Sequence, residues 1–458
     1  MKKIKRVTAL FLSAAMSVSL SACGGNQPAA TEPAATTTPA ADSGAGQPAA
    51  GTESPAAASG ENVTLTMSWW GGDARHEATQ QALAALNQKY PNIKVEGVFG
   101  GWQDWESKMG LAFSQGNAED IVQMGSFWHI MYNQDGQTFV NLYDYRDYID
   151  LTQFDNLEAY EVDGKLYCLP ASMTARTMFW NKSVFAAAGI EIPVTWDELI
   201  AAGGTFKEKL GDEYYPLTMT NLDRMLFMVW YLESQYGKEW VSGKECNYTI
   251  EEITTGFEMI KMLEDSHVMP TMQEIVDNAA DPIERSPVWT DQKWAGVYTW
   301  NTSPKNLQAT LPDPDDLVPG AMFEGFPHTG GMYKAASTYG ITSSCKYPVE
   351  AAMALNYLVN DPEGAGIMGT QRGIPVSKSA IAAAEAAGTV DPLIKEATDI
   401  ALAGAGFPMD EYFESNDYKA TTEGLYDRTF NAFSYGEVDA AGAAKMLLDG
   451  MNETMAKN

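Results

Sequence analysis

The first part of the folded chain alternates short apolar segments with amphipathic ones, a pattern typical of a parallel α/β sheet. Apolar and polar residues alternate over Val63–Trp69, which predicts a β-strand, and Ile93–Phe99 and Asp120–Met124 predict two more. Between these strands, Arg75–Tyr90 and Trp102–Gln115 place their apolar residues on one helical face. This β-α-β-α-β order with short connections predicts parallel strands joined by right-handed crossovers.

Tryptophans stand where these predicted strands end. Trp69 and Trp70 close the first strand, Trp102 follows the second, and Trp128 follows the third. Open parallel sheets bind ligands beyond the carboxyl ends of their strands, so we expect these residues on one rim. A tryptophan can equally be a core residue. The same two alternatives stay open for Trp230, whose predicted helix faces either the core or a cleft.

The rest of the chain is predicted to be mainly helical. Thr195 and Glu198 have the spacing of a capping box at the start of a helix. Further helices are expected over residues 182–188, 222–236, 250–263, 349–359 and within 417–455, and extended segments over 167–171 and 177–181.

The first sixty residues are predicted to lie outside the fold. A cationic start is followed by an apolar stretch over 7–20, which is shorter than the ~20 residues that span a bilayer. Small residues then lead to Cys23, so 1–22 is predicted to be a signal peptide. Cys23 resembles the lipidated first residue of bacterial lipoproteins; the alternative is an ordinary cleaved signal with an incidental cysteine. Residues 23–60, rich in Ala, Pro and Thr, predict a disordered tether.

The remaining chain is long and acidic. Almost 400 residues are more than one hydrophobic core usually serves, which favours two lobes. The composition, 45% hydrophobic and 11% aromatic, is that of a globular protein. The net charge of −30 argues against nucleic acid or an anionic membrane surface as a ligand.

Motifs for catalysis or metal binding are missing from the sequence. It contains no G-x-S-x-G, H-E-x-x-H or P-loop, and its four histidines are scattered. We therefore expect no metal or other cofactor, and not an enzyme. Besides Cys23, the chain has Cys168, Cys246 and Cys345, expected to be buried free thiols, with one disulfide among them as the open alternative.

Several segments in a characteristic order extend over nearly all of residues 61–458. They are KYPNIKVEG, AEDIVQM, YCLPASMTARTMFWNKSVFAAAGIEIPVTWDEL, KWAGVYTWN, YGITSSCKYPVEAAMALNYLV and GIPVSKSA. Together they resemble the family 1 extracellular solute-binding proteins, the maltose-binding-protein-like class. The resemblance implies a two-lobed periplasmic-binding-protein-like α/β fold with three interlobe crossings. It also implies hinge closure on a carbohydrate and delivery to the permease of an ABC importer.

The resemblance also suggests where the lobes divide. Lobe 1 is expected over 61–172 plus 337–374, and lobe 2 over 173–336 plus 375–458. The crossings are expected near Ala171–Ala175, Lys334–Ser337 and Gly373–Ser377. We expect a monomer.

A carbohydrate site needs flat aromatics for the C–H faces of the sugar and planar polar groups for its hydroxyls. Trp300, before Asn301, falls where the resembling family stacks a sugar. The segment WWGGDARHEAT is similar to family members that bind uronate-containing oligosaccharides derived from pectin. The full set of expected ligand-binding residues is Trp69, Trp70, Asp73, Arg75, His76, Trp102, Trp128, Trp230, Trp300, Asn301 and Arg372.

The charged members of this set have two interpretations. Asp73 is a good N-cap for the first helix, and Arg75 and His76 follow in its first turn. Arg75 could bind a ligand carboxylate in bidentate fashion beside the helix N-terminus, or both residues could be solvated at the surface. Arg372 could reach the cleft from the other lobe.

The sequence thus predicts a lipid-anchored, extracytoplasmic solute-binding protein that captures an oligosaccharide and delivers it to a permease. One alternative is a binding protein for a peptide or polyamine, although a polyamine would need acidic groups in the cleft rather than Arg75. Another is a secreted polysaccharide-degrading enzyme, which would need a close pair of carboxylates or a basic catalytic residue.

Overall fold

The computed structural model describes residues 60–102, 105–279 and 282–457. The predicted signal peptide, Cys23 and all but the last residue of the predicted tether lie outside the described residues. Within the described ranges, none of the helices is long and apolar enough to cross a membrane.

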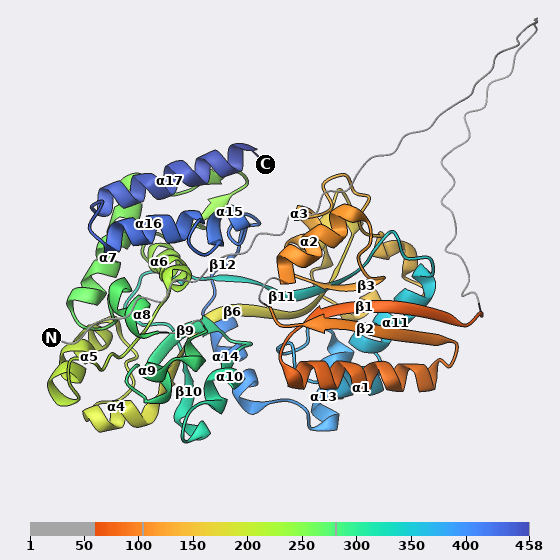
Figure 1. Cartoon of the computed structure of the whole chain (residues 1–458), viewed down its shortest axis with the longest axis horizontal. Helices are drawn as coiled ribbons and strands as arrows, with labels where there is room; N and C mark the ends of the chain where they lie inside the picture. Colours follow the sequence, from red (N-terminus) through yellow and green to blue (C-terminus); the bar gives the residue numbers. More distant parts are fainter. Residues whose placement is uncertain (1–59, 103–104, 280–281, 458) are drawn as a thin grey trace, which may run out of the picture. The chain divides into compact units, whose positions relative to one another are not determined.

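The described residues form an α/β fold around one continuous mixed sheet (Figure 1). Its strand order is β10-β6-β11-β3-β1-β2, with β9 paired to β6 and β12 paired to β11. The strands are β1 (Val63–Trp70), β2 (Ile93–Gly100), β3 (Ile121–Met124), β6 (Leu169–Asn181), β9 (Gly296–Trp300), β10 (Leu317–Gly320), β11 (Met332–Ile341) and β12 (Phe407–Pro408). The pairs β1–β2 and β1–β3 are parallel, which confirms the arrangement predicted for the first three strands.

The long strands β6 and β11 extend through both lobes of the fold (Figure 1). The first half of β6 pairs with β11, from Leu169 opposite Tyr339 to Ala175 opposite Tyr333. Its second half pairs with β9 and β10 instead. The two extended segments predicted over 167–171 and 177–181 are therefore largely one continuous strand, and this strand forms the first crossing.

Lobe 1 combines β1, β2 and β3 with several helices. These are α1 (Asp73–Lys89), α2 (Trp105–Gln115), α3 (Trp128–Met131), α11 (Pro348–Val359), α12 (Pro362–Met368) and α13 (Lys378–Ala387), with a small hairpin of β4 (Glu161–Val162) and β5 (Lys165–Leu166). The N-cap of α1 is Gly72, and Asp73 is the first helical residue, so the predicted cap is wrong by one position. Leu65, Leu86 and Leu355 lie in the core of this lobe.

Lobe 2 is mainly helical, as predicted. Its elements besides β9, β10 and β12 are α4 (Lys182–Ala188), α5 (Trp196–Lys209), α6 (Asn221–Tyr236), β7 (Val241–Ser242), β8 (Glu245–Cys246), α7 (Ile250–Asp265), α8 (Met272–Asn278), α9 (Pro287–Thr290), α10 (Pro304–Ala309), α14 (Pro392–Ala403), α15 (Asn416–Lys419), α16 (Leu425–Ser434) and α17 (Ala440–Lys457). The capping box of Thr195 and Glu198 at the start of α5 is present. Phe227, Phe257 and Leu447 are buried in a core separate from that of lobe 1.

The contacts of α13 and α14 bear on the third crossing, which is expected near Gly373–Ser377. Helix α13 follows that segment but still packs on α12, with Ala380 and Ala383 against Ala365. The next helix, α14, contacts β6 and β10 of lobe 2. We therefore propose that lobe 1 continues through α13, beyond the boundary expected at residue 375, because the small residues of α13 pack on α12.

The three cysteines of the described part are free thiols. Cys168 and Cys345 are buried, whereas Cys246 is half-buried. Burial raises the pKa of Cys168 and of Cys345 to about 12, so both stay protonated at neutral pH. No disulfide forms among them, which answers the alternative that the sequence left open.

Candidate ligand-binding site between the lobes

The strand-end turns of lobe 1 bring three tryptophans together. The ring of Trp70 at the end of β1 lies 5.1 Å from that of Trp102 and 5.7 Å from that of Trp128. Trp102 and Trp128 are stacked with their centroids 6.3 Å apart. Trp128 is buried over Gly125, where a Cβ atom would lie 2.6 Å from the indole nitrogen, but 47% of Trp102 is exposed. The expectation that these strand ends share a rim is confirmed, and Trp102 provides its open aromatic face.

Trp69, by contrast, is a core residue. It is fully buried and stacks on Phe99 with the ring centroids 4.8 Å apart. It covers Gly97 of β2, where a Cβ atom would lie 2.4 Å from the indole. Its Nε1 donates to Nδ1 of His76 at 3.1 Å, which leaves the His76 Nε2 as the protonated nitrogen in the neutral ring. Burial lowers the pKa of His76. Trp69 therefore offers no surface on which a sugar could stack, contrary to the sequence-based expectation.

Lobe 2 presents Trp300 with two cations. The guanidinium of Arg176 lies 4.7 Å from the ring centroid of Trp300, and Nζ of Lys334 lies 4.6 Å from it. Trp300 ends β9 and is half-buried, and Arg176 lies opposite it on β6. Cations over an indole face interact favourably with its negative face. Trp300 thus stands at a strand end beside cationic side chains, and its stacking on a sugar stays a prediction from the resemblance.

Each of these cations is paired with a carboxylate. Arg176 donates to Asp223 and to the carbonyl oxygen of Tyr298, and Lys334 donates to Glu414. The Lys334 side chain is only 10% exposed, and burial lowers its pKa despite the nearby Glu414 carboxylate. The Arg176 Nε is buried without a hydrogen-bond partner in the described structure. Positive groups are thus concentrated at one place in a strongly acidic chain.

A third cation joins this group to the aromatic rim of lobe 1. Nζ of Lys419, at the end of α15, lies 3.0 Å from Oε2 of Glu106 in α2. The same Nζ lies 5.6 Å from the ring centroid of Trp102. Phe127, before α3, also packs against the core of lobe 2. We call Trp70, Trp102, Trp128, Trp300, Arg176, Lys334 and Lys419 the interlobe site.

Arg75 and Arg372 do not belong to this site. Arg75 donates to the carbonyl oxygens of Gln371 at 2.8 Å and Trp70 at 3.2 Å, and burial together with the nearby Arg372 lowers its pKa. Arg372 is buried within lobe 1, so it does not reach the ligand region from the opposite lobe as expected. Asp73 is exposed at the start of α1.

Two further expected site residues are structural. Trp230 is buried in the core of lobe 2 against Phe227 and Phe326, at centroid distances of 5.0 Å in both cases. Asn301 is fully buried; its amide accepts from the backbone of Ala175 at 3.1 Å and donates to Thr398 at 2.7 Å. It fastens the end of β9 to β6 and α14, and its polar atoms are not available to a ligand.

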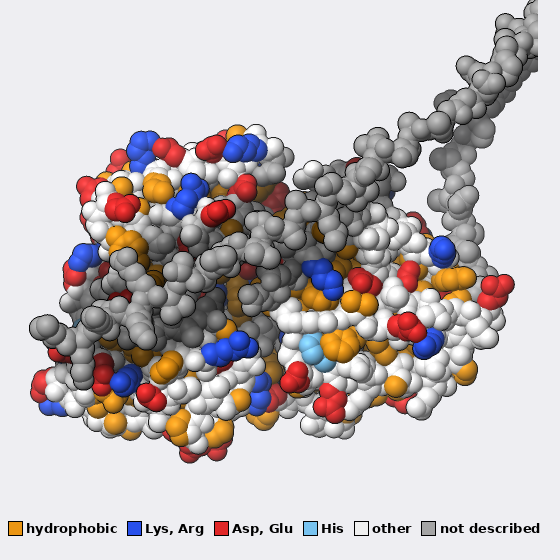
Figure 2. Space-filling model, viewed as in Figure 1, with side chains coloured by type: hydrophobic (Ala, Val, Ile, Leu, Met, Phe, Trp, Pro, Cys, Tyr) orange, Lys and Arg blue, Asp and Glu red, His pale blue; other side chains and the backbone are white. Residues whose placement is uncertain are grey.

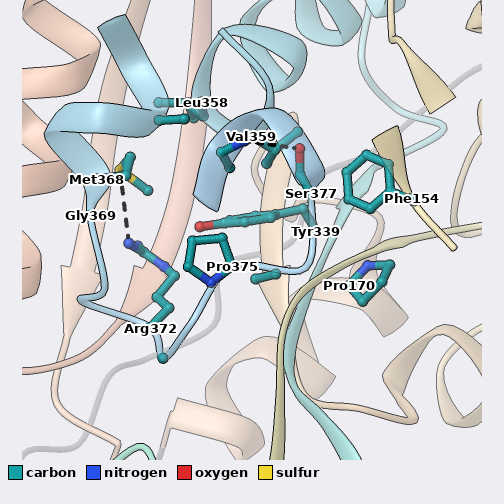
Figure 3. A pocket seen from close by; sticks show the side chains of 14 residues that line it. Phe154, Pro170, Tyr339, Leu358, Val359, Met368, Gly369, Arg372, Pro375 and Ser377 are labelled. Carbon is teal, nitrogen blue, oxygen red and sulfur yellow. Dashed lines mark hydrogen bonds between the residues drawn. The ribbon is translucent and has the colours of Figure 1, made fainter. Parts of the chain in front are cut away.

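A small pocket lies beside the segment that leads to α13 (Figure 3). Tyr339 and Pro375 face each other in it, and Arg372 points toward Met368. The Tyr339 hydroxyl is buried and has no hydrogen-bond partner among the residues described. None of the residues of the interlobe site lines this pocket, so the two are separate.

Sequence reasoning missed most of the charged residues of the interlobe site. Lys334 appears in the sequence analysis only as the start of an expected crossing, and Lys419, Glu414 and Glu106 carry no local signal. Their segments are far apart in the chain and meet only when the lobes come together. Figure 2 shows acidic and basic side chains interspersed over the visible face of both lobes.

A two-lobed α/β fold with its aromatic groups between the lobes defines a class of proteins that bind small solutes. A model of the family described as bacterial extracellular solute-binding protein matches residues 72–365, and the chain belongs to this family. Members of the family act outside the cytoplasm, and the family is one of binding proteins rather than enzymes.

Two solved structures are similar to this chain over most of its length. The chain is similar to a periplasmic oligogalacturonide binding protein from Yersinia enterocolitica, solved with saturated digalacturonic acid. The two are 31% identical with a TM-score of 0.80, over 86% of this chain and 99% of that one. A periplasmic solute binding protein from Pectobacterium atrosepticum is 29% identical, also with a TM-score of 0.80, over 86% of this chain and 99% of the other.

Curated relatives match over shorter segments. The melibiose/raffinose/stachyose-binding protein MelE of Bacillus subtilis is 25% identical over 37% of this chain and 39% of its own length. The diacetylchitobiose binding protein DasA of Streptomyces coelicolor is 28% identical over 34% of this chain and 36% of its own. The chain thus matches well under half the length of these curated relatives.

Proposed function

We propose that this protein captures a uronate-containing oligosaccharide between its lobes and delivers it to the permease of an ABC importer. The observation that carries the proposal is the interlobe site itself. Aromatic faces from both lobes, Trp102 and Trp300, stand beside the cations Arg176, Lys334 and Lys419.

The aromatic part of the site suits a sugar ring. Pyranose rings have C–H groups on their faces, which pack on flat indoles, and hydroxyls around the rim, which need hydrogen-bonding partners. Trp102 offers a half-exposed indole supported from below by Trp70 and Trp128. Trp300 offers a second indole on the opposite lobe, so that a short oligosaccharide could contact both lobes at once.

The charged part of the site favours an acidic sugar. The chain carries a net charge of −30, which repels anions in general, yet three cations lie together here. A uronate carboxylate would form charge-assisted hydrogen bonds with such groups, which are stronger than those to a neutral hydroxyl. The Yersinia relative with saturated digalacturonic acid supports the same ligand class.

Capture would proceed by hinge closure. The ligand binds the open form and shifts the population toward the form in which the lobes meet. The long strands β6 and β11 and the segment after α13 connect the lobes and would bend. We further propose that Cys23 carries a lipid that holds the protein at the outer face of the membrane, next to the permease. The monomeric state and the absence of enzymatic activity remain part of this proposal.

The test is binding of di- and trigalacturonate to the full chain, measured by calorimetry and thermal unfolding, with neutral galactobiose and galactotriose as controls. We expect galacturonides to stabilise the fold by about 2.7 kcal/mol at a hundredfold excess over Kd, with no product released. Stabilisation by the neutral sugars alone would contradict the uronate preference. Stabilisation by neither class would contradict oligosaccharide binding.

A further inference from the structure

The ion pair between Lys419 and Glu106 stands apart from the other contacts of the interlobe site, because its partners come from opposite lobes. We propose that Lys419 binds a carboxylate of the ligand, and that Glu106 takes the place of that carboxylate when the lobes meet without ligand. This inference rests on the proposed function and assigns its charge selectivity to one pair of residues.

The charges of the site divide unequally between the lobes. Lobe 2 and its strands carry three cations, Arg176, Lys334 and Lys419, together with the carboxylates of Asp223 and Glu414. Lobe 1 contributes the third carboxylate, Glu106 on α2. When the lobes separate, Glu106 leaves with lobe 1, and the face of lobe 2 keeps one positive charge in excess. That face then attracts an anion, and Lys419 is the cation that has lost its partner.

Glu106 is poorly satisfied where it stands. It is 8% exposed; its Oε2 contacts Lys419, and its Oε1 is buried without a hydrogen-bond partner in the described structure. A buried carboxylate oxygen without a partner is costly, because water no longer solvates it. Glu106 lies in the first turn of α2, where the helix dipole favours a negative charge. A ligand carboxylate with both oxygens hydrogen-bonded could therefore replace Glu106 beside Lys419.

The position of Lys419 fits the carboxylate of a stacked uronate. Its Nζ lies 5.6 Å from the ring centroid of Trp102, the exposed indole of lobe 1. A uronate ring that packs on an indole carries its carboxylate at the ring edge, which is where a neighbouring lysine can reach it. The ammonium group of Lys419 has three protons to donate, so a ligand carboxylate can take the place that Glu106 has beside it.

This arrangement would select against neutral sugars. A ligand that inserts between Lys419 and Glu106 without a carboxylate leaves both charges desolvated and unpaired, which is strongly unfavourable. A uronate instead restores the charge balance on Lys419. The pair therefore acts as a specificity filter as well as a contact between the lobes.

The experiment compares full-length wild type, Lys419→Met, Lys419→Arg and Glu106→Gln. Calorimetry with digalacturonate and with neutral galactobiose gives the ratio of the two affinities for each protein. Lys419→Met should weaken digalacturonate binding about tenfold or more and change galactobiose binding much less, because only the acidic sugar loses a charge-assisted contact. Lys419→Arg should retain the preference for digalacturonate. Glu106→Gln should strengthen digalacturonate binding, since the competing carboxylate is gone.

Lys445→Met is the matched control, because Lys445 forms an exposed ion pair with Asp449 on α17 and its loss changes the net charge equally. It should leave both affinities unchanged. Equal losses for both sugars in Lys419→Met, or weaker digalacturonate binding in Glu106→Gln, would overturn the inference while leaving the proposed function intact. If wild type binds galactobiose but no galacturonide, the uronate preference itself is wrong and the inference falls with it.

Discussion

Arg372 donates from Nε to Oε1 of Gln123 at 2.8 Å, which ties the segment before α13 to the central strand β3. A second bond, from Nη2 to Oγ1 of Thr79 at 3.0 Å, reaches α1. The guanidinium also lies 5.7 Å from the ring centroid of Tyr339. One buried cation therefore connects three elements of lobe 1, and its role is to hold that lobe together.

Replacing Arg372 with methionine should lower the free energy of unfolding by about 2–4 kcal/mol, because Gln123 and Thr79 lose buried partners. The preference for galacturonide over neutral sugar should stay the same. Urea unfolding and calorimetry measure the two effects. Arg428→Met, at an exposed position, is the control and should change stability little. A stable Arg372→Met protein that no longer binds galacturonides would mean that Arg372 contacts the ligand after all.

Substitution of Trp300 should weaken ligand binding, whereas substitution of Trp230 should lower stability. Trp300→Ala removes a half-buried indole beside Lys334 and should weaken oligosaccharide binding about tenfold, with a small effect on stability. Trp230→Ala opens a cavity among Phe227, Phe323 and Phe326 and should cost about 3–5 kcal/mol of stability. Thermal unfolding and ligand titration of both variants separate the roles. Unchanged affinity in Trp300→Ala would remove Trp300 from the site.

Glu233 should make the stability of lobe 2 depend on pH. Burial raises its pKa to about 8, even though Oε2 accepts a bond from the backbone of Gly331 at 2.7 Å. Because the folded-state pKa lies above the unfolded value, the protonated form stabilises the fold at low pH. That contribution is lost as the pH rises from about 4 to about 8.

Glu233→Gln mimics the protonated carboxyl, so it should gain stability over wild type as the pH rises. The two proteins should be similar at pH 4, and the variant should be more stable by a few kcal/mol, about 2–4, at pH 8.5. Urea unfolding across this pH range gives the difference in unfolding free energy between the two proteins. Other titrating groups contribute equally to both proteins and largely cancel in this difference. A difference that does not vary with pH would contradict a titrating Glu233.

The three thiols of the described part should be unreactive in the folded protein. Burial raises the pKa of Cys246 to about 11 and that of Cys168 and Cys345 to about 12, so little thiolate exists at neutral pH. A thiol reagent should modify them slowly at pH 7.5 and all of them rapidly in urea. A reductant should not change the thermal unfolding temperature. A lowered unfolding temperature in reductant would instead indicate a disulfide.

Local pattern alone was enough to predict much of the fold. The alternation over Val63–Trp70 and the helical periodicity of α1 and α2 depend on neighbours within a few residues, which a sequence displays directly. The convergence of Trp70, Trp102 and Trp128 followed as well, because parallel strands of one sheet end at the same edge. Trp69 was misjudged, since strand position does not tell whether an indole covers a neighbouring glycine such as Gly97.

The sequence by itself determined the α/β elements, the first parallel strands and the aromatic rim of lobe 1. Only the tertiary structure decided which charges meet there. Lys334, Glu414 and Lys419 come from segments that no local period connects with Trp102 or Glu106. The spacing of apolar residues reflects the geometry of a single helix or strand, so a sequence displays it directly. An ion pair between the lobes depends on how the two lobes pack together, which local spacing does not show.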